Sequence, residues 1–137
     1  MAFHTSLTIP VSTTISAPAD IILPLSPLLV QEVDITFPNG CVGLVEVWFE
    51  YRSRQIWPLN SDGRFIGNGQ TVRFRPNFPI DKPPYELLIR GINSDDTFPH
   101  TVYILVDGEL PRGVLAQFVD SLLGGSGRNI PIADNME

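Results

Sequence analysis

Apolar and polar residues alternate along most of this chain, in short runs that prolines and glycines interrupt. Alternation with a period of two is typical of a β-strand that buries one face. The clearest run is LLVQEVDITF, residues 28–37, where Val33, Ile35 and Phe37 alternate with polar side chains. The turn FPNG follows at 37–40, and its Asn-Gly pair favours the positive φ angles of a tight hairpin.

The same pattern recurs up to about residue 110. Further strands are predicted within 41–51, 54–67, 70–78, 85–93 and 101–108. Thirteen prolines and eleven glycines divide the chain about every ten residues, which is the spacing of short strands joined by turns. We therefore predict an all-β protein, an antiparallel β-sandwich or jelly roll of about seven to eight strands over residues 28–110.

The segment before this domain, residues 1–27, is predicted to be an extended N-terminal arm. It contains a single charge, Asp20, and its alternation is interrupted by four prolines, which restrict it to an edge strand or an extended chain. Ordering a residue costs about 1–2 kcal/mol of backbone entropy, so the arm needs apolar burial elsewhere. We expect it to pack on a neighbouring subunit through Leu7, Ile9, Val11 and Ile15.

The segment after the domain, residues 111–137, is predicted to hold a short amphipathic helix followed by a tail. The stretch GVLAQFVDSLLGG has apolar residues at helical spacing and a Gly-Gly stop. Because so short a helix is marginal alone, its apolar stripe must dock on another surface. The predicted docking residues are Val114, Leu115, Phe118 and Leu122.

The charge distribution argues against one class of partner and suggests another. The net charge of −6 argues against nonspecific nucleic-acid binding, which depends on neutralising phosphates. Residues 52–90 are nevertheless locally basic, with six Arg and one Lys against three acids. We predict a basic face that pairs with acidic residues such as Glu46 and Glu50 of another subunit, although solvated strand faces also explain the pattern. The basic face comprises Arg52, Arg54, Arg73 and Arg75.

Candidate chemistry is sparse. The chain has one cysteine, Cys41, and two histidines, and we predict no catalytic residues, no metal site and no cofactor. The polar stretches 60–63 and 93–97 are interpreted as turns in preference to calcium sites, because neither has a full calcium-loop spacing. Trp48 and Trp57 are candidate exposed aromatics for sugar binding, against the alternative of core residues.

No signal peptide, membrane span or membrane partner is expected, because no basic leader and no long uninterrupted apolar stretch occurs. The architecture resembles that of the decoration (cement) proteins of tailed-phage capsids, and the run VDITFPNGCVGLVEVWFEYRSRQIWPLNSDGRF, residues 33–65, is similar to small phage-encoded proteins. The resemblance implies a non-enzymatic virion protein, made in the host cytoplasm and placed on the capsid surface.

Its expected partners are its own copies, with a homotrimer favoured, and a major capsid protein or other shell subunit. Two alternatives stay open: a carbohydrate- or receptor-binding module of a phage tail or adhesin, and a subunit of a filament or other protein shell.

Overall fold

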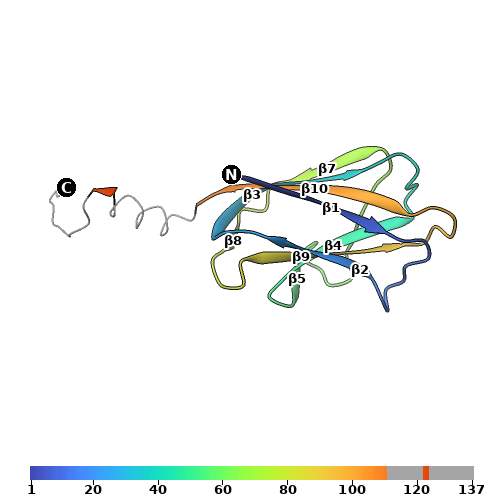
Figure 1. The fold of residues 1–137 in the computed structure, drawn as a ribbon, viewed down its shortest axis with the longest axis horizontal. Coiled ribbons are helices and arrows are strands. Elements are labelled where there is room, and N and C mark those ends of the chain that lie inside the picture. The colour runs from blue at the N-terminus through green and yellow to red at the C-terminus, as the bar shows by residue number, and fades with distance from the viewer. Residues whose placement is uncertain (111–121, 124–137) are drawn as a thin grey trace.

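Ten strands form two antiparallel sheets in the computed structural model, which describes residues 1–110 and 122–123 (Figure 1). The strands are β1 (Ala2–Ile9), β2 (Ala19–Pro24), β3 (Leu28–Phe37), β4 (Val45–Tyr51), β5 (Arg54–Trp57), β6 (Phe65–Ile66), β7 (Gln70–Phe74), β8 (Phe78–Ile80), β9 (Glu86–Asn93) and β10 (His100–Glu109). The structure confirms the prediction of an all-β protein, with two antiparallel sheets consistent with a β-sandwich.

Each sheet contains five strands. The first sheet has the order β1-β10-β3-β7, with β8 also paired to β3. The second has the order β2-β9-β4-β5, with β6 also paired to β4. β5 and β6 pair with opposite halves of β4, and β7 and β8 with opposite halves of β3. Each of these pairs therefore acts as one interrupted strand, so the ten strands occupy eight strand positions.

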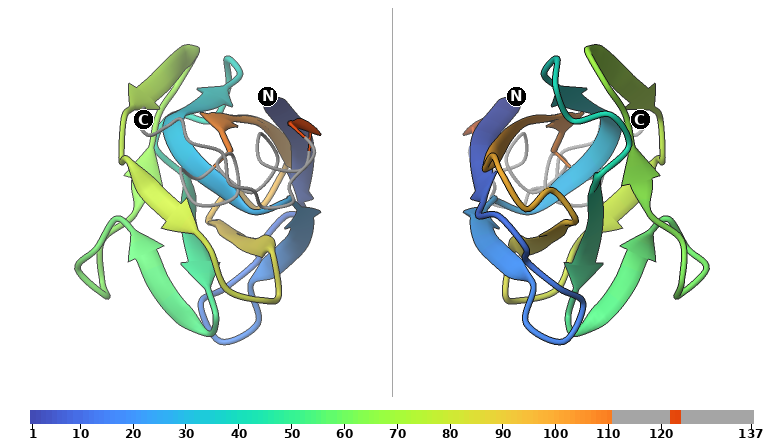
Figure 2. Two further views of the ribbon diagram at one scale, coloured as in Figure 1. Left: turned by 90° about the vertical axis from the view of Figure 1, so that its left-hand side faces the viewer. Right: turned by 90° about the vertical axis from the view of Figure 1, so that its right-hand side faces the viewer.

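Consecutive strands mostly change sheet, so the connections collect at the two ends of the sandwich. The segments 10–18, 38–44, 67–69 and 94–99 lie at one end, here called the loop end, which faces the viewer in the right panel of Figure 2. The segments 25–27, 52–53 and 81–85 lie at the opposite end. The chain also leaves β10 at that opposite end, beside Leu29.

The core lies between the sheets and follows the predicted alternation. In β3, Val33, Ile35 and Phe37 are fully buried, as the hydrophobic pattern indicates. Trp57 lies in a group of aromatic rings from both sheets, with centroid distances of 5.4 Å to Phe49, 5.5 Å to Phe74 and 5.8 Å to Phe78. Edge-to-face packing of this kind adds to the stabilisation from apolar burial alone.

The prediction of a separate arm over residues 1–27 is wrong. β1 pairs with β10 over eight positions, from Ala2↔Asp107 to Ile9↔His100, and β2 pairs with β9. Leu7 is 4% exposed and Ile9 is fully buried, both in the core of their own domain. The alternating residues do form strands, but this chain's own sheets supply the edge positions that the prolines require.

Most of the predicted C-terminal helix, including Val114, Leu115 and Phe118, lies outside the described residues. Leu122 is described, and its side chain is 70% exposed. No helix among residues 1–110 and 122–123 has the length and apolar character needed to cross a membrane.

Candidate functional site

The loop end is held together by backbone hydrogen bonds between loops that are far apart in sequence. The amide of Ser12 donates to the carbonyl of Asp95 at 2.9 Å, and that of Ser94 donates to Leu44 at 2.8 Å. Gly69 donates to Pro38 at 3.2 Å, which links the fourth loop. Because each loop bonds to another, the four loops form one connected surface rather than four independent tips.

Asn93 is the buried residue that joins these loops. It ends β9 and is fully buried. Its side-chain amide donates to the carbonyl of Ile9 at 3.2 Å and of Phe98 at 3.0 Å, and its side-chain oxygen accepts from the amide of Asp95 at 2.9 Å. One polar side chain thus satisfies three backbone groups, one at the end of β1 and two in the loop 94–99, as buried polar groups require.

Asp95 and His100 form a second contact, between the loop 94–99 and the first residue of β10. The Asp95 carboxylate lies 2.9 Å from His100 Nε2 and accepts from the amides of Thr97, at 2.8 Å, and Phe98, at 3.3 Å. These bonds, that to His100 foremost, lower the pKa of Asp95 below its ordinary value. The carboxylate therefore organises the turn, in agreement with the interpretation of 93–97 as a turn. Among the described residues, no group of three or more His, Cys, Asp or Glu side chains is placed to hold a metal ion.

Apolar side chains project from the loop end. Exposed fractions are 57% for Ile15, 66% for Val42 and 63% for Phe98, and Val11 and Leu44 are 39% and 37% exposed. Of the four residues predicted to pack on a neighbour, Leu7 and Ile9 are thus core residues, whereas Val11 and Ile15 belong to this surface. Val42, Leu44 and Phe98 were missed because nothing in a lone sequence indicates that their loops meet.

Val42 is also strained. Its φ is +49° and that of Gly43 is +72°, in a turn closed by the amide of Leu44 donating to Cys41 at 2.8 Å. Positive φ is costly for a β-branched residue. Because the Val42 side chain is exposed, burial in the domain's own core does not offset this cost.

The four predicted arginines do not form one basic face. Arg73 lies on β7 of the first sheet, and Arg75 follows the end of that strand. Arg73 Nε lies 2.9 Å from Asp34 Oδ1, and Arg75 Nη1 lies 3.2 Å from Glu32 Oε1. Their acidic partners are therefore in the neighbouring strand β3. Arg52 and Arg54 lie at the β4–β5 turn of the second sheet instead.

Neither predicted exposed tryptophan is exposed. Trp57 is 6% exposed within the aromatic group. Trp48 does share the outer face of β4 with Glu50, as predicted, and its Nε1 donates to Glu50 Oε2 at 3.1 Å. However, the guanidinium of Arg64 lies 4.1 Å from the centre of its ring, so Trp48 is only 4% exposed. A sugar platform built on these two rings is thereby excluded.

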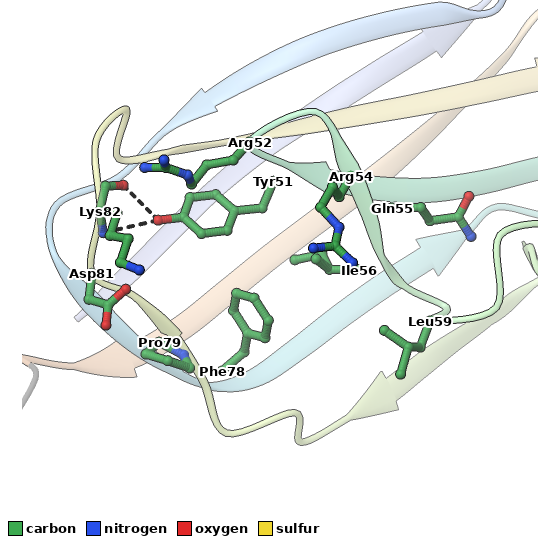
Figure 3. A pocket seen from close by; sticks show the side chains of 10 residues that line it. All are labelled: Tyr51, Arg52, Arg54, Gln55, Ile56, Leu59, Phe78, Pro79, Asp81 and Lys82. Atoms are coloured by element: carbon green, nitrogen blue, oxygen red, sulfur yellow. Dashed lines mark hydrogen bonds between the residues drawn. The ribbon is translucent and has the colours of Figure 1, made fainter.

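A cleft of about 430 Å³ opens where the edge strands β5 and β8 face each other (Figure 3). Its apolar lining includes Ile56, Leu59, Phe78 and Pro79, and its charged lining comprises Arg52, Arg54, Lys82 and Asp81. The Tyr51 hydroxyl fixes one wall, donating to the carbonyl of Lys82 at 2.6 Å and accepting from its amide at 3.1 Å.

A smaller hollow of about 200 Å³ lies on the outer face of the first sheet. Tyr103, 48% exposed, shares it with the Asp34–Arg73 pair and with Thr36 and Thr71, whose hydroxyl oxygens are 2.9 Å apart. His4 and Leu105 complete the part nearest β1 and β10. The hollow thus combines an accessible aromatic ring with fixed hydrogen-bonding groups.

Comparison with models of known protein families, with curated proteins and with solved structures finds no match to this chain.

Proposed function

We propose that this protein is a non-enzymatic structural protein of a virion, a jelly roll that decorates and stabilises a capsid from its outer surface. The strand order supports the jelly-roll assignment. Counting β5 with β6 and β7 with β8, the first, eighth, third and sixth strand positions form one sheet. The second, seventh, fourth and fifth form the other. This is the two-sheet arrangement of jelly rolls, which recur in viral capsid proteins and in lectins.

Because one fold hosts many functions, the proposal depends on the loop end. Five exposed apolar side chains project there from loops that hydrogen bonds hold in place. A surface that is rigid before binding loses little conformational entropy when a partner covers it. A strained, exposed Val42 is a further sign that this turn serves something outside the domain's own core.

The proposed partner of the loop end is the major capsid protein. Copies of this chain would sit side by side on the shell as a homotrimer, each with its loop end toward the shell. Shell contact through loops replaces contact through an arm, because residues 2–9 are committed to the sandwich.

Particle association tests this function directly. The virus or cell that encodes the protein is made to express wild type or the double variant Ile15→Ser/Phe98→Ser, and particles are purified by sedimentation. Ile22→Ser is the matched control, because Ile22 is 52% exposed on the outer face of the second sheet, away from the loop end.

We expect wild type and Ile22→Ser to sediment with the particles, and the double variant to do so at least tenfold less. A wild-type protein that sediments with no particle would refute the function. Assembly into a filament by the purified protein alone would instead support the alternative of a filament subunit.

A second candidate function, carbohydrate recognition, is favoured by the hollow around Tyr103. Sugar rings stack on accessible aromatic faces while their hydroxyls bond to fixed polar groups, and the hollow offers Tyr103 beside Asp34, Arg73 and Thr71. A glycan array comparing wild type with Tyr103→Ala tests it. Binding that Tyr103→Ala abolishes supports this function, and the absence of binding by wild type eliminates it.

A further inference from the structure

The cleft between β5 and β8 is a site that the proposed shell contact does not use. It lies at the side of the sandwich where both sheets end in interrupted edge strands, β5 with β6 and β7 with β8. Along that side it lies toward the end opposite the loop end. Leu59, at its margin, is 81% exposed. Further apolar lining from Ile56, Phe78 and Pro79 lies beside it.

The cleft is cationic although the whole chain is acidic. Arg52, Arg54 and Lys82 contribute three positive charges and Asp81 one negative charge, so its lining carries +2 on a chain with a net charge of −6. An apolar floor with a cationic margin fits an extended peptide that alternates branched apolar side chains with a carboxylate.

One segment of this chain has that composition. Residues 129–137 read NIPIADNME, and in an extended strand Ile130, Ile132 and Asp134 fall on the same side. Two isoleucines would then contact the floor while Asp134 meets the cationic margin. Pro131 carries no amide hydrogen, and it projects to the other side of such a strand.

The path of the chain brings this segment within reach. Glu109 pairs with Leu29, and Leu29 pairs with Pro79 in the cleft lining. Two strand spacings separate Glu109 from Pro79, about 10 Å. The 18 residues 111–128 span up to about 60 Å when extended, so the linker does not restrict docking. A tethered segment also has a high effective concentration, which favours the same chain over a second copy in dilute solution.

We propose that residues 129–137 of the same chain bind in this cleft, adding an extended segment beside the edge strand β5 or β8. Docking would cover Leu59 and pair Asp134 with the basic residues.

Disulfide trapping in the chain of residues 1–137 tests the proposal. The variant Leu59→Cys/Ile132→Cys is oxidised at micromolar concentration, and products are resolved by non-reducing electrophoresis and peptide mapping. Cys41 does not interfere, because it is fully buried and its burial raises the pKa of its thiol. The matched control is Ile22→Cys/Ile132→Cys, with each thiol's accessibility measured separately by maleimide labelling.

We expect an intramolecular disulfide that forms at least tenfold faster for the Leu59 pair than for the Ile22 pair. Adding Arg54→Glu and Lys82→Glu should slow it at least fivefold. Equal rates for the two pairs would overturn the proposal. So would disulfide-linked dimers in place of monomers, which would identify a second copy as the occupant, or faster trapping with Phe118→Cys than with Ile132→Cys. None of these outcomes depends on particle binding, so the shell function is tested independently.

Discussion

At the scale of the residue, Asn93 holds the loop end together through three side-chain hydrogen bonds. Its side chain satisfies two carbonyls and one amide in a site closed to water. Asn93→Ala leaves these groups unpaired, and we expect it to lower the free energy of unfolding by about 2–4 kcal/mol, measured by urea denaturation. Asn68→Ala is the control, because its one bond to Gly40 is exposed, and should cost under about 1 kcal/mol. Similar values for both variants would contradict this role.

Asp95 makes the loop end sensitive to acid. Its pKa is lowered in the folded protein, so its stabilising contribution is fully present above the unfolded value of about 3.9 and is lost as the pH falls through the folded value. We expect the free energy of unfolding, measured in urea from pH 7 to pH 3, to decrease at the acid end. Asp95→Asn should remove part of that decrease while lowering stability at pH 7. An unchanged pH profile in Asp95→Asn would show that its hydrogen bonds do not favour the charged form.

Replacing Val42 is expected to change the stability of the domain and its binding to particles in opposite directions. Replacing it with glycine removes the penalty of a left-handed β-branched residue, about 1–2 kcal/mol, against a glycine entropy cost of about 0.5–1 kcal/mol. We therefore expect Val42→Gly to raise the free energy of unfolding by up to about 1.5 kcal/mol in urea denaturation. If the loop end contacts the shell, the same variant should sediment less with particles. Loss of stability without loss of particle binding would assign Val42 a purely structural role.

At the scale of the element, β1 belongs to the domain rather than to a partner. Removing residues 1–20 exposes the edge of β10 and deletes Leu7 and Ile9 from the core, so we expect the truncated protein not to fold, as judged by circular dichroism and urea denaturation. Ile9→Ala should cost about 2–5 kcal/mol as a buried truncation, whereas Ile15→Ala should change stability by less than about 0.5 kcal/mol. A cooperatively folded 21–137 fragment would restore the arm interpretation.

The strands could be predicted because the alternation of apolar and polar residues is a local pattern. The strands with which each one pairs could not be predicted, because pairing depends on residues far away in the sequence. The pattern around Val33, Ile35 and Phe37 specifies a strand whichever strands flank it. Whether Leu7 and Ile9 face their own core or a neighbour depends on β10, about a hundred residues away. The same reason explains Trp48. The alternation along β4 predicts which face its side chain occupies, but its burial depends on Arg64, which lies 16 residues further along the chain. The loop surface similarly depends on contacts between distant loops.

At the scale of the whole molecule, the two ends of the sandwich have different properties. The loop end has hydrogen-bonded loops and five exposed apolar side chains, while the opposite end carries the β4–β5 turn and the exit of the chain from β10 (Figures 1 and 2). An object with one adhesive end can bind a surface in a single orientation. The proposed function therefore predicts not only binding to a shell but which residues become covered.

Two matched cysteine variants measure that orientation. Ser94 lies at the loop end and Ser53 at the opposite end, and both are exposed. Ser94→Cys and Ser53→Cys should react equally with a maleimide in the isolated protein, because Cys41 is buried and contributes no background. On purified particles we expect Ser94→Cys to be protected at least tenfold, because the shell covers the loop end, while Ser53→Cys reacts as before. Protection of Ser53→Cys instead would show that the opposite end faces the shell. The contact would then lie at the cleft rather than at Ile15, Val42 and Phe98.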